Sequence, residues 1–251
     1  WTFGGGAGGT YASLQDFNGA LNEFLTNKYD TFEAWEAASG ASASGSWATN
    51  NQVAGYLLRG DVTWHPTARL GFSVRGEYLG VLGIRAHFYG AGTTGDTLEY
   101  SLNGSLTLIP VQGGLTLEFP LGDSGLIVSG SLLAGRAFAA GHIGQHQTFR
   151  SASSSTSDDR SVAYDLRGSA PIASAEAGFL YRLSESSDIV IEVGRRWANV
   201  RPMIIQQNID ANGDGVLDIH KGNPYRNVGH TRTVAFDYSG LAFTLGVRLR
   251  I

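Results

Sequence analysis

The sequence predicts an all-β fold, an eight-stranded antiparallel up-and-down transmembrane β-barrel, and three observations support this prediction. Residues 241–251 alternate strictly, with Leu, Phe, Val and Ile on one face and Ala, Thr, Gly and Arg on the other. Successive side chains of a strand point to opposite faces, so this segment presents one apolar and one polar face. Seven further segments alternate in the same way, and short connections between them alternate with long ones.

The eight segments are joined by connections of two lengths. HPTAR at 65–69, PLGDSG at 120–125 and SESSD at 184–188 are short, and the other four connections are longer. An up-and-down meander then places the short turns and both termini at one end. This asymmetry, with an even number of strands, is typical of bacterial outer-membrane barrels. Because proline cannot donate to a ladder, we expect a bulge or kink at Pro110. The expected strands cover about 1–12, 54–64, 70–78, 98–119, 126–141, a segment ending near 183, 188–200 and 241–251.

The long connections differ in composition. In the first, Ser13 with Asp16 resembles a capping box, so we expect a short helix followed by a flexible loop. The second is glycine-rich near 90–96, the third is serine-rich over about 142–160, and the last covers about 201–231. Apolar residues recur at helical spacing in the first connection, at Leu14, Phe17, Leu21 and Leu25.

The composition agrees with a single β-rich domain over residues 1–251. Glycine is abundant (35), proline is scarce (6) and cysteine is absent, so no disulfide framework exists. No window holds the roughly 18 uninterrupted apolar residues of a transmembrane helix. A net charge of -4 and the lack of a basic tract argue against a nucleic acid partner. Because no signal peptide precedes WTFGGGAGGTYAS, we expect a mature chain whose export signal has been removed.

The polar faces of the predicted strands hold charges of both signs. Eight strands enclose an interior only wide enough for side chains, and arginine and carboxylate groups can pair there and satisfy one another's hydrogen bonds. We therefore expect a lumen closed by an ion-pair network, not an open pore. The predicted network contains Arg59, Asp61, Arg75, Glu77, Glu118, Glu176, Glu192, Arg196 and Arg248, with Arg182 and Arg250 on the same faces.

A soluble β-sandwich is the alternative fold, because its apolar face would turn inward and its charged face would be solvated. Two features favour the membrane barrel. The connections sort cleanly by length, and aromatic residues gather near strand ends, where an interfacial girdle is expected. These aromatic residues are Trp64, Phe119, Tyr181 and Phe243.

Three segments resemble small outer-membrane barrels of the outer membrane protein A and W type. They are the glycine-rich opening GGGAGGTYAS, the run IPVQGGLTLEFPL that enters a turn, and the closing SGLAFTLGVRLRI. The resemblance is one of pattern, covers almost the whole chain and implies a bacterial cell outer membrane and contact with its lipid. Such barrels commonly end in an aromatic residue, whereas this chain ends in Ile251.

The sharpest local motif is DANGDGVLD in the last long connection. Its oxygen-bearing residues and one glycine match the early positions of a calcium loop, where carboxylate and amide oxygens converge on a hard cation. Lys221 replaces the final bidentate Glu, so the motif is closer to short extracellular calcium loops than to an EF-hand. An acidic turn without metal is the alternative. The expected calcium ligands are Asp210, Asn212, Asp214, Asp218 and the backbone carbonyl of Val216.

The sequence favours a non-enzymatic envelope protein, a structural or surface-binding scaffold with a closed lumen. Its partner would be a surface or envelope protein that meets the long loops, where specificity usually lies. The alternative function is a narrow channel for small or apolar solutes, like that of outer membrane protein W relatives. A lipid-modifying enzyme is a third possibility, but no G-x-S-x-G elbow occurs, and the serine run 151–157 and the pair His142 and His146 are expected to be exposed loop residues.

Overall fold

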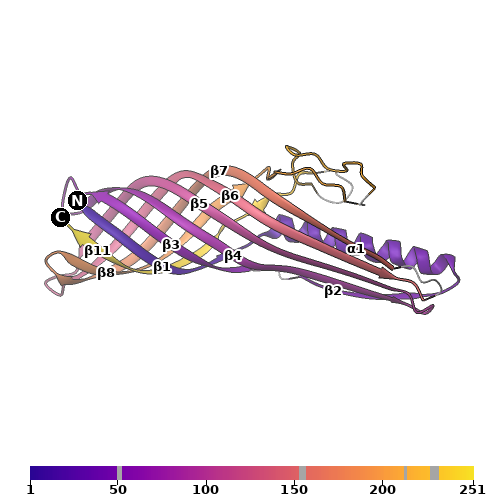
Figure 1. The fold of residues 1–251 in the computed structure, drawn as a ribbon. Coiled ribbons are helices and arrows are strands. Elements are labelled where there is room, and N and C mark those ends of the chain that lie inside the picture. The colour runs from indigo at the N-terminus through magenta and orange to yellow at the C-terminus, as the bar shows by residue number, and fades with distance from the viewer. Residues whose placement is uncertain (50–52, 153–156, 212–213, 227–231) are drawn as a thin grey trace.

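The structure, a computed structural model, describes all residues except 50–52, 153–156, 212–213 and 227–231. Its long strands are β1 (Thr2–Ala12), β3 (Val53–Trp64), β4 (Leu70–Gly92), β5 (Thr97–Pro120), β6 (Leu126–Arg150), β7 (Ser157–Ser184), β8 (Ser187–Val200) and β11 (Gly240–Arg250). These eight strands pair antiparallel in chain order, and β11 pairs with both β8 and β1, which closes the ring (Figure 1). The predicted eight-stranded up-and-down barrel is therefore confirmed.

Shorter elements complete the described fold. The strand β2 (Ala43–Thr49) pairs with β4, β9 (Ile204–Ile205) pairs with β7, and β10 (Phe236–Asp237) pairs with β8. The helix α1 (Gln15–Ala38) follows β1. Within the described ranges, no helix is long and apolar enough to cross a membrane. Both termini lie at the end of the ring that has the short turns (Figure 1).

The strands differ in length, and this difference divides the molecule into two parts. The strands β1, β8 and β11 have 11, 14 and 11 residues, close to the roughly 9–11 residues that cross a bilayer. By contrast, β4 to β7 have 23, 24, 25 and 28 residues. Their excess length continues past the ring, away from the termini, as a sheet (Figure 1). We call this part, together with β2, β9 and α1, the extension.

The inner face of the strands changes from polar to apolar where the extension begins. On β5, even-numbered side chains face inward over its whole length, and those near the short turn include the buried Glu118 and Gln112. From Leu108 back to Leu98 the buried residues are apolar. The outer face changes in the opposite sense, from the exposed Leu115 in the ring to polar residues in the extension.

This exchange of environments corrects the bulge or kink expected at Pro110. The sequence has Leu98–Leu108 on one face of a strand that continues past Pro110 to Leu115 and Phe119. The ladder between β5 and β6 is continuous from Thr97 to Pro120, so no bulge occurs there. The register shifts instead on β4, between Leu82 and Ile84. The apolar residues of β5 lie on the inner face in the extension and on the outer face in the ring. The environment of each face changes along the strand, whereas the register of the strand with β6 does not.

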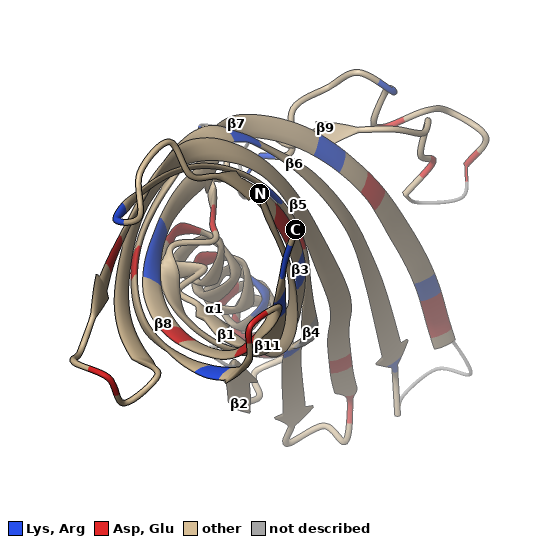
Figure 2. Ribbon diagram, turned by 90° about the vertical axis from the view of Figure 1, so that its left-hand side faces the viewer, with Lys and Arg blue, Asp and Glu red and all other residues tan. Residues whose placement is uncertain are grey.

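The helix α1 provides the apolar partner of the inner face. Figure 2, which looks along the barrel from the end with the termini, shows α1 within the outline of the strand ring. Its buried Phe17 packs on Phe236 with ring centroids 5.0 Å apart, and Phe24 packs on Tyr100 at 4.8 Å. The predicted helix is confirmed and has 24 residues.

The start of α1 differs from the predicted capping box. The N-cap is Leu14, in the left-handed region with φ 45, and no side chain caps the helix. Asp16 reaches away from Ser13: it accepts a hydrogen bond from the Ala235 backbone N–H at 2.6 Å and forms an ion pair with Arg232. The carboxylate therefore ties the helix to the last connection instead of satisfying the free N–H groups of its own first turn.

Most of the predicted long loops are strands of the extension. Only the turn 93–96 separates β4 from β5, and β6 continues to Arg150 through the segment predicted as a serine-rich loop. The segment predicted as a flexible loop after the helix contains β2. Polar residues such as His142 and His146 suggested loops, but they lie on the exposed outer face of β6. Outside a membrane, that face meets water.

Candidate functional site

Buried charged side chains fill the lumen, beginning at the short-turn end with a cluster around Asp188. This carboxylate on β8 is completely buried. It forms ion pairs with Arg248 Nη2 at 3.0 Å and Arg250 Nη2 at 2.9 Å, both on β11. Arg248 also forms an ion pair with Glu118 on β5. Two carboxylates and two guanidinium groups thus compensate one another at this mouth.

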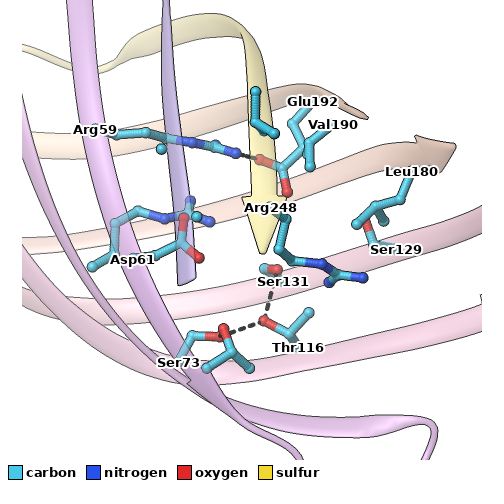
Figure 3. A pocket seen from close by; sticks show the side chains of 15 residues that line it. Arg59, Asp61, Ser73, Thr116, Ser129, Ser131, Leu180, Val190, Glu192 and Arg248 are labelled. Carbon is cyan, nitrogen blue, oxygen red and sulfur yellow. Dashed lines mark hydrogen bonds and ion pairs between the residues drawn. The ribbon is translucent and has the colours of Figure 1, made fainter. Parts of the chain in front are cut away.

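A second cluster lies deeper in the lumen. Glu176 on β7 is 3.5 Å from Arg59 Nη1, measured from its Oε2 atom, and also pairs with Arg75. Arg59 forms a further ion pair with Glu192 on β8 (Figure 3). Asp61 lines the same cavity, although among the described residues no guanidinium or ammonium lies within 4.0 Å of it. These contacts join β3 and β4 on one side of the lumen to β7 and β8 on the other.

A third pair lies nearest the extension. Arg196 Nη2 is 2.9 Å from Glu77 Oε2, and both side chains are almost completely buried. Beside them, the Gln112 amide donates to Ser174 Oγ at 3.1 Å. The next inward residues along these strands are apolar, and they close the polar lumen off from the extension; they are Leu57, Leu79, Leu108, Ala137 and Ile172.

Hydroxyl groups complete the polar filling. Thr63, Ser73, Thr116 and Ser131 form a chain across β3 to β6, with successive oxygens 2.8, 2.8 and 3.0 Å apart (Figure 3). The glycine-rich strand β1 makes room for this filling, because a Cβ on Gly4 would lie only 2.6 Å from the carboxylate of Asp61. The cavity left between these side chains measures about 30 Å³. That volume holds one or two water molecules.

The outer face of the ring is apolar. Leu132 is 67% exposed and Leu245 55% exposed, and similar residues cover the neighbouring strands. Aromatic side chains border this belt: Trp64 and Phe72 stack at 5.7 Å near the short turns, and Tyr56 and Tyr78 stack at 5.9 Å toward the extension. A closed ring with apolar exterior, aromatic girdles and charged interior is the architecture of an outer-membrane barrel.

The belt ends where charged side chains appear on its outer face. On β6 the outward residues are apolar or glycine from Leu126 to Ala134, and Arg136 follows, donating to Ser169 on β7 at 2.8 Å. On β8, Arg195 lies 5.7 Å from the Trp197 ring. Arginine and tryptophan are favoured at the membrane–water interface. The outer boundary of the membrane therefore lies near Arg136 and Arg195.

Comparison with known proteins finds similar chains only among solved structures. No protein-family model matches the chain, and no curated protein matches it. Among solved structures, the barrel is similar to Neisserial surface protein A, with 10% identity, a TM-score of 0.38 and coverage of 100% of this chain and 97% of the other.

Two further solved structures are similar. The outer membrane protein OprG from Pseudomonas aeruginosa has 14% identity, a TM-score of 0.39, and coverage of 99% of this chain and 94% of the other. Ail, the attachment invasion locus protein of Yersinia pestis, has 10% identity, a TM-score of 0.31, and coverage of 99% and 98%. All three are small bacterial outer-membrane β-barrel proteins.

The remaining residues considered from the sequence lie outside the lumen clusters. Arg182 is exposed beside the short turns. His142 Nδ1 lies 2.8 Å from Asp165, and His146 Nδ1 lies 3.4 Å from Asp159, so each histidine pairs across the outer face of the extension with its own carboxylate. Sequence reasoning placed Asp188 at the start of the expected strand 188–200 but did not include it among the lumen residues. It also missed the chain of hydroxyl groups, although Thr63, Ser73, Thr116 and Ser131 lie at alternating strand positions that face inward.

The loop 210–218 is only partly described, because Asn212 lies outside the described residues. Asp210 accepts the Gly215 N–H at 2.8 Å, with Gly215 at φ +85, and Asp218 accepts the Ala211 N–H at 2.7 Å. Asp214 accepts the Val216 N–H at 2.7 Å. No group of three or more His, Asp or Glu side chains able to hold a metal is found among the described residues. Calcium binding stays a prediction.

Proposed function

We propose that this chain is a non-enzymatic outer-membrane scaffold whose closed barrel holds the extension at the cell surface. One observation supports this function most directly: paired charges fill the lumen, and the cavity lined by Arg59, Asp61 and Arg248 measures only about 30 Å³. A path for solutes would require several ion pairs to break together, and each break would leave a charge buried without a partner. The extension, with its helix and strands β4 to β7, is then the part that meets a surface or envelope partner.

The orientation of the proposal follows from the lengths of the connections. Outer-membrane barrels have short periplasmic turns and long extracellular segments. The short turns and both termini therefore face the periplasm, and the extension faces outward. Surface exposure can be measured directly with protease or a membrane-impermeant reagent on intact cells.

Planar-bilayer recording separates the scaffold from the alternative, a narrow channel. We expect the purified protein to give no steady conductance steps, because the ion pairs of Arg75 and Arg196 occlude the lumen. The double variant Arg196→Ser with Glu77→Ser removes one ion pair and is expected to give conductance steps. It empties part of the cross-section of the lumen and leaves neither charge without its partner. The matched control is Arg195→Ser, which changes a charge on the outer face of the same strand.

Steady conductance steps from the unaltered protein that change in size on Arg75 or Arg196 replacement would establish the channel and overturn the closed lumen.

Incubation with outer-membrane lipid extract tests the non-enzymatic part of the proposal. We expect the lipid species to stay unchanged, and a new species that depends on the protein would contradict it.

We also propose that the loop 210–218 binds calcium through Asp210, Asp214 and Asp218. The Gly215 turn, which wraps a backbone N–H onto the first carboxylate of the motif, supports this proposal. Bound calcium would neutralise the loop's carboxylates and order it.

The calcium proposal predicts a rise in melting temperature when millimolar calcium is added. Asp210→Ala with Asp214→Ala is expected to abolish this rise, because it removes two of the three carboxylates. Asp123→Ala, in an exposed short turn, is the control and is expected to keep the response. An unchanged calcium response in the double variant would contradict the site, and magnesium in place of calcium tests its selectivity.

A further inference from the structure

The extension and the last connection form a second cavity, separate from the lumen. It measures about 790 Å³ and lies between α1, the inner faces of β5 to β7 and the last connection. Sites for small molecules usually measure about 300–1,000 Å³ and are mostly apolar with a few polar groups. This cavity has that composition, and its apolar lining includes Phe17, Leu21, Phe24, Leu102, Tyr164 and Tyr225.

One buried hydroxyl in the cavity has no partner. Tyr100 lines the cavity and is 2% exposed, and its Oη atom makes no hydrogen bond within the described part of the chain. Leaving a buried donor unsatisfied is unfavourable. Burial raises the pKa of Tyr100, and the neighbouring Tyr225 and Tyr164 raise it further, so the hydroxyl keeps its proton at neutral pH. It can therefore donate to an acceptor on a bound molecule.

A cation with no acidic partner among the described residues lies near Tyr100, although it is not one of the residues that line the cavity. Lys28 on α1 is half-buried, its ammonium lies 5.2 Å from the ring of Phe24, and it donates to Gln147 Oε1 at 2.5 Å. In the ladder Gln147 stands directly opposite Tyr100. Among the described residues no carboxylate lies within 4.0 Å of Lys28. Burial and the nearby Arg160 lower its pKa, as expected for an ammonium that lacks an anion.

The other charged residues of the lining do not supply that anion. Asp218 and Arg226 have opposite charges, and both belong to the last connection. Burial and the charge of Asp218 raise the pKa of Tyr164 on the other wall, and the Asp218 carboxylate accepts a hydrogen bond from the Ala211 N–H. An anionic ligand group would be repelled from Asp218 and attracted to Lys28 and Arg226.

We infer that this cavity binds an amphiphilic carboxylate, with its chain or ring among the aromatic side chains and its carboxylate between the Lys28 ammonium and the Tyr100 hydroxyl. Both oxygens of the carboxylate then find a donor, and the buried hydroxyl gains the acceptor that the protein does not provide. A medium-chain fatty acid is the simplest molecule of this class. The inference rests on the proposed function only for its orientation, which places the cavity on the cell surface.

The chain itself provides an internal control, because its two lysines are Lys28 and the exposed Lys221. With the full-length protein in lipid nanodiscs, amine acetylation at each lysine is measured by mass spectrometry while laurate is added. We expect laurate to protect Lys28 and to leave Lys221 unchanged. Dodecanol, which has the same chain without the charge, is expected to protect Lys28 at least 10-fold less well.

Two variants test the contacts. Tyr100→Phe is expected to weaken laurate protection of Lys28 roughly 10-fold, because a hydrogen bond to a charged group is lost. Lys28→Met is expected to weaken laurate binding, measured by calorimetry, by at least 10-fold and to leave dodecanol binding unchanged, whereas Lys221→Met should change neither. Heat-modifiable migration shows that each variant has folded.

Equal protection by laurate and dodecanol, or equal protection of both lysines, would overturn the carboxylate site. The same reagent in a membrane-impermeant form tests the orientation separately. If it fails to label Lys221 on intact cells, the surface scaffold is contradicted, whether or not laurate binds to the purified protein.

Discussion

Replacing Glu176 with Gln is expected to lower the free energy of unfolding of the barrel by about 3–5 kcal/mol. Glu176 is the shared partner of Arg59 and Arg75, whose side chains are 5% and 4% exposed. The amide of Gln keeps the shape but removes the charge, so two buried guanidinium groups compete for the remaining carboxylates. The measurement is the temperature or urea concentration at which the folded, fast-migrating form is lost.

The matched control is Glu185→Gln, the same chemical change in an exposed short turn, which is expected to shift stability by less than about 0.5 kcal/mol. Adding Arg75→Met to Glu176→Gln removes one of the orphaned charges, and the double variant should lose less stability than the sum of the two single variants. If Glu176→Gln is as stable as Glu185→Gln, the luminal pairs do not neutralise one another as the distances indicate.

The ring could be predicted because a membrane barrel assigns one environment to each face of a strand. Alternation in 241–251 was therefore sufficient to place Leu245 outside and Arg248 inside, and the same rule places Arg75 and Glu77 in the lumen. The pairing of these charges depends on which strands face each other across the lumen. The pattern of a single strand holds no information on the partners across the lumen, so the pairing of Asp188 with Arg248 and Arg250 was not predicted.

The extension could not be predicted in the same way, because alternation does not say which solvent meets which face. Leu102 and Leu115 both belong to apolar runs of β5, yet one is buried beneath α1 and the other faces lipid. The polar residues of the extension's outer face, such as His146, were interpreted as loop. The hydrogen bond from Lys28 to Gln147, which pairs with Tyr100 in the ladder, depends on the helix packing onto the sheet, and residues so far apart in the sequence gave no signal of it.

The exchange of environments makes a sharp prediction for one strand. Leu132 and His146 both lie on the outer face of β6, the first within the apolar belt and the second in the extension. Leu132→Arg is expected to destabilise the barrel by about 2–4 kcal/mol, because an arginine near the bilayer midplane is costly. His146→Arg is expected to change stability by less than about 0.5 kcal/mol, since that side chain meets water and can still pair with Asp159.

Folding into lipid vesicles followed by urea titration measures both variants on the same scale. The pair tests the boundary near Arg136 as well as the two faces, because Leu132 and His146 lie on opposite sides of it along one strand. A boundary further along the strand would make both substitutions costly. If neither is costly, the belt does not face lipid, and the apolar exterior would have to be covered by protein. Only a membrane that ends near Arg136 makes one substitution severe and the other neutral.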